Sequence, residues 1–298
     1  MIRDLESYRT YIEAHLLDYL PEVEGPGRRL QEAMIYSLEA GGKRLRPALL
    51  LASCELAGGK MSDAIPYAIA LEYIHTYSLI HDDLPCMDDD ELRRGKPTNH
   101  VIFGAGIATL AGDGLLNSAF EAMNRDMFLY FDDPRELKAR VRASYEIAKG
   151  AGVQGMVAGQ TADLEAEGMK SISEETLDYI HNRKTMAMIR AAVRAGAMIG
   201  SATDNLLSDL TNYGEALGLA FQIQDDILDV VGSAEEMGKN PGMDATHDKA
   251  TYPAVYGLEE AYRRNDILCD RAIDCMGQYD EDGAFFVDLI EKVRQRRK

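Results

Sequence analysis

The stretch "SDAIPYAIALEYIHTYSLIHDD", residues 62–83, predicts a long apolar helix that ends in a pair of carboxylates. Its apolar side chains recur with the period of an α-helix. We expect Ser62 to cap the first turn, because a serine hydroxyl accepts hydrogen bonds from the free N–H groups at a helix start. Pro85 follows Asp82 and Asp83 closely and should end the regular helix, since proline lacks an N–H.

Segments with helical period follow one another along the chain, from residues 8–20 to the basic C-terminus. Ser173, which is followed by Glu174 and Glu175, is expected to cap a helix that continues to residue 200. Strand patterns and hairpin turns are nearly absent, and no linker rich in proline, serine or glycine divides the sequence. We therefore predict an all-α fold, with residues 1–298 forming a single large helical bundle. The longest loop-like stretch, 232–253, is a candidate functional loop.

The composition argues against several classes of protein. A formal net charge of −18 disfavours nucleic acid and anionic membrane surfaces as partners, because both require a basic footprint. No uninterrupted apolar run reaches the ~18 residues of a membrane-spanning helix, so stable membrane insertion is not expected. The four cysteines are scattered without a C-x-x-C pair, which predicts reduced thiols in a cytoplasmic protein rather than a zinc site or a disulfide framework.

Six carboxylates crowd into residues 82–91, and such a cluster is unfavourable unless something neutralises it. His75 and Asp82 are seven residues apart, so a helix brings them to nearly the same face. A lone histidine is more often a packed core residue, but the face shared with Asp82 favours a ligand role for His75. Once Pro85 has ended the helix, Asp88 can fold back toward Asp82.

A second acidic pattern, "FQIQDDILD" at residues 221–229, lies within an apolar helix. Asp225 and Asp229 share one helix face, and Gln222 lies one turn earlier on the same side. A solvated acidic surface is the usual explanation of a charge run, but the apolar neighbours disfavour it here. We interpret the two patterns as aspartate-rich walls that face each other across a central cavity, where hard oxygen ligands suit Mg²⁺.

Cations accompany these acids. Lys43, Arg44 and Arg46 precede a buried helix in "GGKRLRP", and a helix N-terminus after two glycines is a natural anion site. For each single cation a surface role is the default, and Arg44 in particular has a structural alternative. Arginine and lysine clamps together with Mg²⁺ are the recurring means of holding a diphosphate. A diphosphate site beside an apolar interior suggests an isoprenoid substrate.

The chain resembles the trans-isoprenyl diphosphate synthases over almost its whole length. The motifs that carry the resemblance occur in the order typical of that family: "GGKRLRP", "HDDLPCMDDDELRRGKPTNH", "GQTADLE", "RKT", "FQIQDDILD" and "GKNPGMDATHDKATYP". The first acidic motif has four residues between its aspartate pair and Asp88. This spacing is similar to that of the bacterial short-chain members, above all those that make farnesyl diphosphate. The resemblance implies the isoprenoid-synthase type of helical bundle.

The resemblance also implies the metal ligands. Three Mg²⁺ ions are expected in each active site, two on the first acidic wall and one on the second. The implied ligands are Asp82, Asp83 and Asp88 on the first wall and Asp225, Asp226 and Asp229 on the second. Among these, Asp83 would assist its neighbours, and Asp226 and Asp229 would support Asp225.

Isopentenyl diphosphate and an allylic diphosphate are the implied substrates. Residues implied to hold the allylic diphosphate are Arg93, Lys184 and Lys239, and those implied to hold isopentenyl diphosphate are Lys43, Arg46, His75 and Arg94. Lys184, Thr185 and Gln222 would act at the reacting centre, with Gln160 and Asp163 in a motif nearby. In the implied reaction, diphosphate leaves the allylic substrate, the double bond of isopentenyl diphosphate attacks the resulting cation, and a proton is lost to the released pyrophosphate.

Product length is a question of packing. In the family, the residues four and five positions before the first aspartate form the floor of the tail pocket, and here they are Ser78 and Tyr77. The bulky Tyr77 should stop a growing chain early, although an ordinary core tyrosine is the alternative. The pattern favours farnesyl diphosphate (C15), with geranyl (C10) and geranylgeranyl (C20) diphosphate as alternative products.

Two rival functions differ from this interpretation in their sequence requirements. A class I terpene cyclase would lack "GGKRLRP" and carry another second metal motif, whereas this chain has "DDILD". A non-catalytic regulatory subunit of such an enzyme should have lost acidic residues from one wall, and none is missing here. Family members are usually homodimers, and the apolar helices around residues 101–122 are a candidate interface.

Overall fold

The computed structural model describes residues 3–167, 169, 172–231 and 251–296. Within these ranges nearly all regular structure is helical, which confirms the all-α prediction. The α-helices are α1 (Leu5–His15), α2 (Arg28–Leu38), α3 (Leu45–Leu56), α4 (Met61–Asp82), α5 (Asn99–Phe103), α6 (Ala105–Phe128), α7 (Pro134–Ala151), α8 (Met156–Ala166), α9 (Glu174–His181), α10 (Ala187–Ile199), α11 (Asp204–Val231), α14 (Tyr252–Tyr256), α15 (Leu258–Gly277) and α16 (Asp280–Arg294). The 3₁₀ turn η1 (Gly25–Gly27), the π-helical turn η2 (Asn182–Met186) and the short strands β1 (Leu92–Arg93) and β2 (Lys96–Pro97) complete the described elements.

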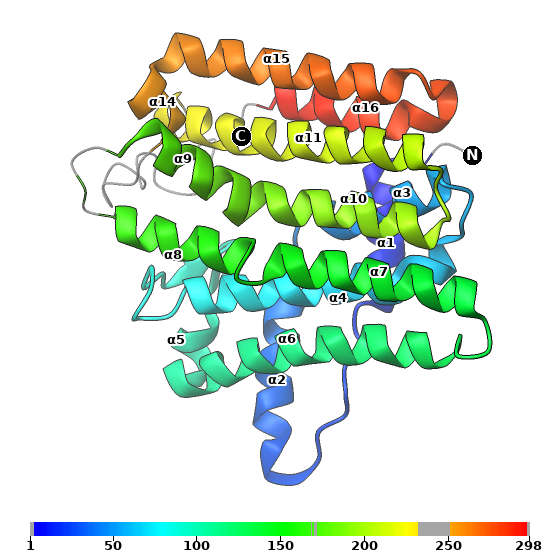
Figure 1. The fold of residues 1–298 in the computed structure, drawn as a ribbon. Helices are drawn as coiled ribbons and strands as arrows, with labels where there is room; N and C mark the ends of the chain where they lie inside the picture. Colours follow the sequence, from blue (N-terminus) through cyan, green and yellow to red (C-terminus); the bar gives the residue numbers. More distant parts are fainter. Residues whose placement is uncertain (1–2, 168, 170–171, 232–250, 297–298) are drawn as a thin grey trace.

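The most apolar helices lie at the centre of the bundle, and amphipathic helices surround them (Figure 1). α4 packs against α3 and α6, whereas α10 packs against α3, α7 and α11. α15 and α16 cover α11 from outside. The C-terminal ends of α4 and α11 lie at the same end of the bundle, where α8, α9 and α14 are also found (left in Figure 1). The two acidic patterns therefore belong to one end of the molecule.

Close backbone packing joins the central helices. A Cβ atom on Gly196 of α10 would lie only 2.0 Å from the carbonyl oxygen of Leu50 in α3, so the glycine lets these two helices touch. Among the described helices, none combines the length and the apolar composition that crossing a bilayer requires.

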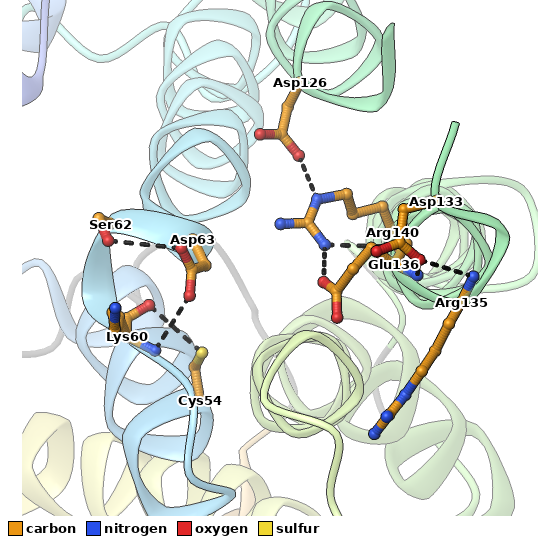
Figure 2. A network of polar contacts seen from close by, with 9 residues as sticks. All are labelled: Cys54, Lys60, Ser62, Asp63, Asp126, Asp133, Arg135, Glu136 and Arg140. Carbon is orange, nitrogen blue, oxygen red and sulfur yellow. Dashed lines mark hydrogen bonds and ion pairs between the residues drawn. The ribbon is translucent and has the colours of Figure 1, made fainter. Parts of the chain in front are cut away.

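The start of α4 differs from the prediction. The helix begins at Met61, and the backbone N–H of Lys60 donates to Oδ2 of Asp63 at 3.3 Å (Figure 2). The hydroxyl of Ser62 contacts Asp63 instead, at 3.4 Å. The predicted Ser62 cap is therefore wrong, because the aspartate one residue later reaches back to the N–H group that precedes the helix.

The long helix predicted from Ser173 to residue 200 has the expected start but is not continuous. The Ser173 hydroxyl accepts from the N–H of Thr176 at 3.1 Å, as predicted. The π-helical turn η2 then separates α9 from α10. At this turn α8 crosses at backbone contact, since a Cβ atom on Gly159 would lie 2.3 Å from the Lys184 nitrogen. Such π-turns frequently occur at functional sites.

A buried ion-pair cluster joins α6 to α7 (Figure 2). Arg140 is only 1% exposed, and its Nε donates to Oδ2 of Asp126 at 2.9 Å. Its Nη1 donates to Oε2 of Glu136 at 2.5 Å, and its guanidinium carbon lies 3.4 Å from the centre of the Tyr130 ring. Two carboxylates and an aromatic face thus surround one buried cation.

Candidate active site

A cavity of about 330 Å³ lies between α4, α8 and η2. Its polar lining residues are Arg46, His75, Ser78, His81, Asp82, Gln160, Thr161, Lys184 and Thr185, and its other lining residues are Tyr77, Leu79, Met87, Met156, Val157 and Leu164. Charged groups of both signs thus share the cavity with thioether, aliphatic and aromatic side chains. This lining suits a ligand with an anionic head and an apolar tail.

The first acidic motif folds back on itself after α4 ends at Asp82. The N–H of Asp88 donates to the carbonyl oxygen of Asp82 at 2.9 Å, which confirms the predicted return of the chain. Burial, together with the charges of Asp88 and Asp83, raises the pKa of Asp82 to about 6, although Lys184 and Arg93 act in the opposite direction. Within the described ranges, no side chain donates a hydrogen bond to the Asp82 carboxylate.

Asp83, expected to assist at the metal, is paired with Arg93 in this structure. Arg93 Nε lies 2.7 and 2.9 Å from the two carboxylate oxygens, and Nη2 lies 2.6 Å from Oδ1. Asp83 is 3% exposed and, with Arg93, lines a small second pocket rather than the main cavity. The structure therefore places Asp83 as the partner of a cation that the sequence analysis assigned to the allylic diphosphate.

β1 and β2 form a short antiparallel hairpin that carries Arg93 and Arg94. Arg94 lies at the turn, and its Nη1 donates to the carbonyl oxygen of Gly41. A Cβ atom on Gly42 would lie 2.8 Å from the same nitrogen, so glycine at this position leaves room for the guanidinium group. The hairpin thereby brings Arg94 to the "GGKRLRP" segment, as expected if both belong to one anion site.

Arg46 of α3 and His75 of α4 lie together at the cavity, with Nη1 3.5 Å from Nε2. Burial and the charge of Arg46 hold the pKa of His75 well below its usual range, so its ring is neutral at pH 7. The Nε of Arg46 is buried and has no hydrogen-bond partner in the described structure. A buried donor without a partner is costly, and an anionic ligand would supply one.

Arg44 and Lys43, the two other cations of the "GGKRLRP" segment, differ in their burial. Arg44 is 3% exposed and donates to Glu72 Oε1 at 2.6 Å and to the carbonyl oxygen of Leu38 at 2.7 Å. These contacts favour the structural alternative for Arg44. Lys43 is exposed, and its Nζ lies 5.6 Å from the centre of the Phe221 ring on α11.

A chain of hydrogen bonds connects η2 to α11. Thr185 Oγ1 donates to Gln222 Oε1 at 2.9 Å, and Gln222 Nε2 donates to Asp226 Oδ1 at 2.9 Å. Asp226 Oδ2 accepts from the N–H of Tyr252 at 2.8 Å and lies 3.5 Å from His181 Nε2. The protein thus engages both oxygens of Asp226, which places this predicted metal ligand as the support of Gln222.

Asp225 lies in a different environment on the same helix, next to the C-terminal tail. It forms an ion pair with Arg296, whose guanidinium carbon lies 5.3 Å from the centre of the Phe221 ring. Burial raises the pKa of Asp225, against the effect of Arg296 and Lys43. Arg296 could not be predicted from the sequence, because the basic segment "KVRQRRK" shows charge but not which helix it reaches. Asp229, one turn later, is half-buried.

The carboxylates suit a divalent cation that takes its remaining ligands from elsewhere. Among the described residues, no group of three or more His, Cys, Asp or Glu side chains could hold a metal ion by itself. Mg²⁺ typically takes one or two carboxylates and completes its octahedron with waters and substrate phosphates. Asp82, which is half-buried and lacks a side-chain donor in the described chain, fits such a site.

The "GQTADLE" and "RKT" motifs meet where α8 crosses η2. Lys184 Nζ lies 2.5 Å from Asp163 Oδ2. Gln160, one turn before Asp163, lines the cavity, and its buried Oε1 has no partner in the described structure. Lys239 and residues 232–250 of the predicted loop lie outside the described residues.

Tyr77 and Ser78 line the cavity, as expected for residues of a tail pocket. His81 was not predicted from the sequence. Its ring lies 5.5 Å from the Tyr77 ring, and its Nε2 lies 3.0 Å from the carbonyl oxygen of Thr109. A Cβ atom on Gly112 of α6 would lie 2.2 Å from His81 Nε2, so the glycine provides the space for this ring. The apolar wall that α8 supplies through Met156, Val157 and Leu164 was also not predicted from the sequence. A glycine inside a helical pattern was the available signal for the His81 contact.

Known proteins match nearly the whole chain. The family model described as Polyprenyl synthetase matches residues 27–282. The farnesyl diphosphate synthase of Geobacillus stearothermophilus is 46% identical over 293 residues, covering 98% of this chain and 96% of that protein. The geranylgeranyl diphosphate synthase of Cyanophora paradoxa is 47% identical over 267 residues, with 90% and 87% covered. The crystal structure of an FPP/GFPP synthase from Zymomonas mobilis has a TM-score of 0.85 at 35% identity and covers 97% of both chains.

Proposed function

Because this chain belongs to the polyprenyl synthetase family and is a trans-prenyltransferase, we propose that it condenses isopentenyl diphosphate with dimethylallyl or geranyl diphosphate in a Mg²⁺-dependent reaction. The products are farnesyl diphosphate and pyrophosphate. The cavity carries this proposal, because it combines the carboxylate of Asp82 and the cations Arg46 and Lys184 with an apolar wall.

We assign the allylic diphosphate to the side of the cavity between the two acidic motifs. Asp82 at the end of α4, Asp88 in the turn that follows it, and Asp225 on α11 are the proposed ligands of three Mg²⁺ ions. When bound, the metal neutralises the charge that develops on the departing diphosphate. Arg93, oriented by Asp83, and Lys184, oriented by Asp163, supply positive charge to the same group.

We assign the isopentenyl diphosphate to the cations at the start of α3. Arg46 offers a buried N–H group without a partner in the described structure, and His75 lies beside it. Arg94 reaches the same segment from the hairpin, and Lys43 is exposed there. With this assignment the second substrate would lie next to the first, as attack by its double bond requires.

Two neutral oxygen-bearing side chains, Thr185 and Gln222, are the proposed stabilisers of the allylic cation. Thr185 donates its hydroxyl hydrogen to Gln222, which leaves the lone pairs of Thr185 Oγ1 available to a positive charge in the cavity. Asp226 fixes the Gln222 amide in turn. The new carbon–carbon bond forms between the substrates, and the proton lost afterwards passes to the released pyrophosphate, so no side-chain nucleophile is required.

A C15 product fits the proposed tail pocket, which ends at Tyr77 and His81. Tyr77 is 7% exposed and contacts His81, which α6 holds in place through Thr109 and the space at Gly112. Two rings in contact form a rigid stop for an elongating chain. Geranyl and geranylgeranyl diphosphate remain the alternative products, and relatives named for the latter are similar to this chain.

We further propose that the enzyme is a cytoplasmic homodimer. Val101, Ile102 and Leu110 on α5 and α6 are each about half exposed (48%, 46% and 54%), which gives these helices an apolar outer surface. All four cysteines are free, in keeping with a reducing compartment. A monomeric mass by sedimentation equilibrium would contradict the dimer.

The test of the function reads the product directly. The purified protein is incubated with Mg²⁺, labelled isopentenyl diphosphate and either dimethylallyl or geranyl diphosphate. After phosphatase treatment, chromatography of the extracted alcohol should show farnesol, and chelation of the metal should abolish it. Asp82→Ala should remove activity while the protein stays folded. Absence of any prenyl alcohol from the wild-type protein would refute the proposed function.

A further inference from the structure

We propose, on the basis of the proposed function, that Arg296 occupies Asp225 in the ligand-free enzyme and that the metal–diphosphate unit must displace it. Asp225 is the carboxylate that we assigned to the metal on the second acidic wall. In the described structure, that carboxylate is already neutralised by a guanidinium group from the C-terminal tail.

The main chain of Arg296 is fixed by buried amides. Its carbonyl oxygen accepts from Gln224 Nε2 at 2.8 Å, and its N–H donates to the carbonyl oxygen of Val293 at 3.2 Å. Gln224 is itself held by Asn265 of α15, whose Nδ2 lies 2.5 Å from Gln224 Oε1. Gln224 and Asn265 are 5% and 3% exposed, so a buried pair of amides holds the backbone of the tail beside α11.

The side chain of Arg296, unlike its main chain, is accessible to solvent. The side chains of Arg296 and Asp225 are 24% and 35% exposed, so the ion pair can open without unfolding the helices around it. Arg296 also lies over the Phe221 ring, whose centre is 5.6 Å from Lys43 Nζ. The guanidinium group is therefore next to a cation that we assigned to isopentenyl diphosphate.

A guanidinium group and a divalent cation compete for the same carboxylate. Both carry positive charge, and Arg296 is already paired with Asp225 Oδ1, so a metal ion at Asp225 would be repelled until the guanidinium group moves. The ion pair thus neutralises the Asp225 carboxylate before substrate arrives. Breaking this ion pair costs free energy, and that cost reduces the net binding free energy of the metal–diphosphate unit.

The test compares Arg296→Gln with a matched control two residues earlier. Arg294→Gln also removes a tail arginine, but Arg294 pairs with Asp270 at 2.5 Å on the outer helix α15. Isothermal titration calorimetry measures the binding of Mg²⁺ to each protein in the presence of inorganic pyrophosphate. We expect the Arg296→Gln variant to bind roughly two- to fivefold more tightly than wild type, as the loss of a partly exposed ion pair allows, and the Arg294→Gln variant to be unchanged.

The outcomes separate this inference from the proposed function. Equal or weaker binding by the Arg296→Gln variant would overturn the inference alone. If the wild type binds pyrophosphate without dependence on Mg²⁺, the proposed function fails together with it. In an Asp225→Asn background, Arg296→Gln should give no further gain, and a gain there would also overturn the inference. Should Arg296→Gln fold poorly, Arg296→Met provides the second measurement: it removes the same charge and keeps an aliphatic side chain next to Phe221, so binding should again be tighter than in wild type, and equal or weaker binding would overturn the inference.

Discussion

Replacing Arg93 by glutamine separates the stabilising role of its ion pair from its role at the substrate. The wild-type pair joins a nearly fully buried carboxylate, Asp83, to a guanidinium group that is 24% exposed, through three contacts of 2.6 to 2.9 Å. The Arg93→Gln variant leaves the Asp83 charge buried without its partner. The variant should therefore lose both stability and activity.

The size of the stability change follows from the burial of the two partners. Removal of one partner from a buried ion pair costs about 3–5 kcal/mol. Arg93 already contacts water, so the space that it leaves can be hydrated, and we expect about 3 kcal/mol for Arg93→Gln. Asp83→Asn combined with Arg93→Gln removes both charges and should restore stability to within about 1.5 kcal/mol of wild type, the net worth of an ordinary hydrogen bond.

The double variant should regain stability but not catalytic activity. A missing cation at the developing charge lowers turnover about 10²–10³-fold, whether or not Asp83 is also neutralised. Asp83→Asn alone keeps the Arg93 charge but releases its orientation, and a misplacement of about 1 Å costs up to about 10²-fold. Urea unfolding followed by circular dichroism gives the free energies, and labelled isopentenyl diphosphate gives kcat/KM. Wild-type turnover in the double variant, or an Arg93→Gln variant as stable as wild type, would refute this reasoning.

Three further predictions test other parts of the structure. Tyr77→Ala removes one of the two rings that end the pocket, so chromatography of the dephosphorylated product should show longer prenyl alcohols; an unchanged product length would contradict the role of the ring. Arg140→Ala strands the buried Asp126 (Figure 2) and should lower the free energy of unfolding by about 3–5 kcal/mol, with a smaller loss when Asp126→Asn is added; urea unfolding measures both, and equal losses would argue against the ion pair. Burial raises the pKa of the Cys54 thiol to about 12 and keeps it protonated, whereas Cys86 is exposed, so a disulfide reagent at pH 8 should modify Cys86 first, and a Cys86→Ser variant that keeps the fast phase would contradict this.

The helical class was readable from the sequence because one periodicity dominates the chain. The apolar run of residues 62–83 and the cap at Ser173 both indicated helices that the structure contains. The exact start of α4 was not readable, since Asp63 and Ser62 are both good cap formers and only the local backbone decides which of them reaches the N–H of Lys60. The π-helical turn at residues 182–186 lies where α8 crosses, and such a tertiary contact leaves no local signal in the sequence.

The sequence predicted which kinds of residue form the site, but only part of what each residue contacts. The acidic and basic motifs identified Asp82, Arg46 and His75, which line one cavity. Sequence could not show that Asp83 turns to Arg93, because neighbouring residues on a helix point in directions about 100° apart and only the packing of the hairpin decides which one enters the cavity. Arg296 was missed for a related reason, since the position of a tail depends on the helix against which it folds.

The end of α4 has an electrostatic consequence. A helix carries a partial negative charge at its C-terminus, equivalent to about half an elementary charge, which acts on groups in its last turn. Asp82 is the last residue of α4. The peptide dipoles of α4 therefore add to the field of the Asp82 carboxylate instead of opposing it. A bare pyrophosphate group approaching this helix end meets repulsion, so binding is favoured when the divalent cation precedes it or arrives with it.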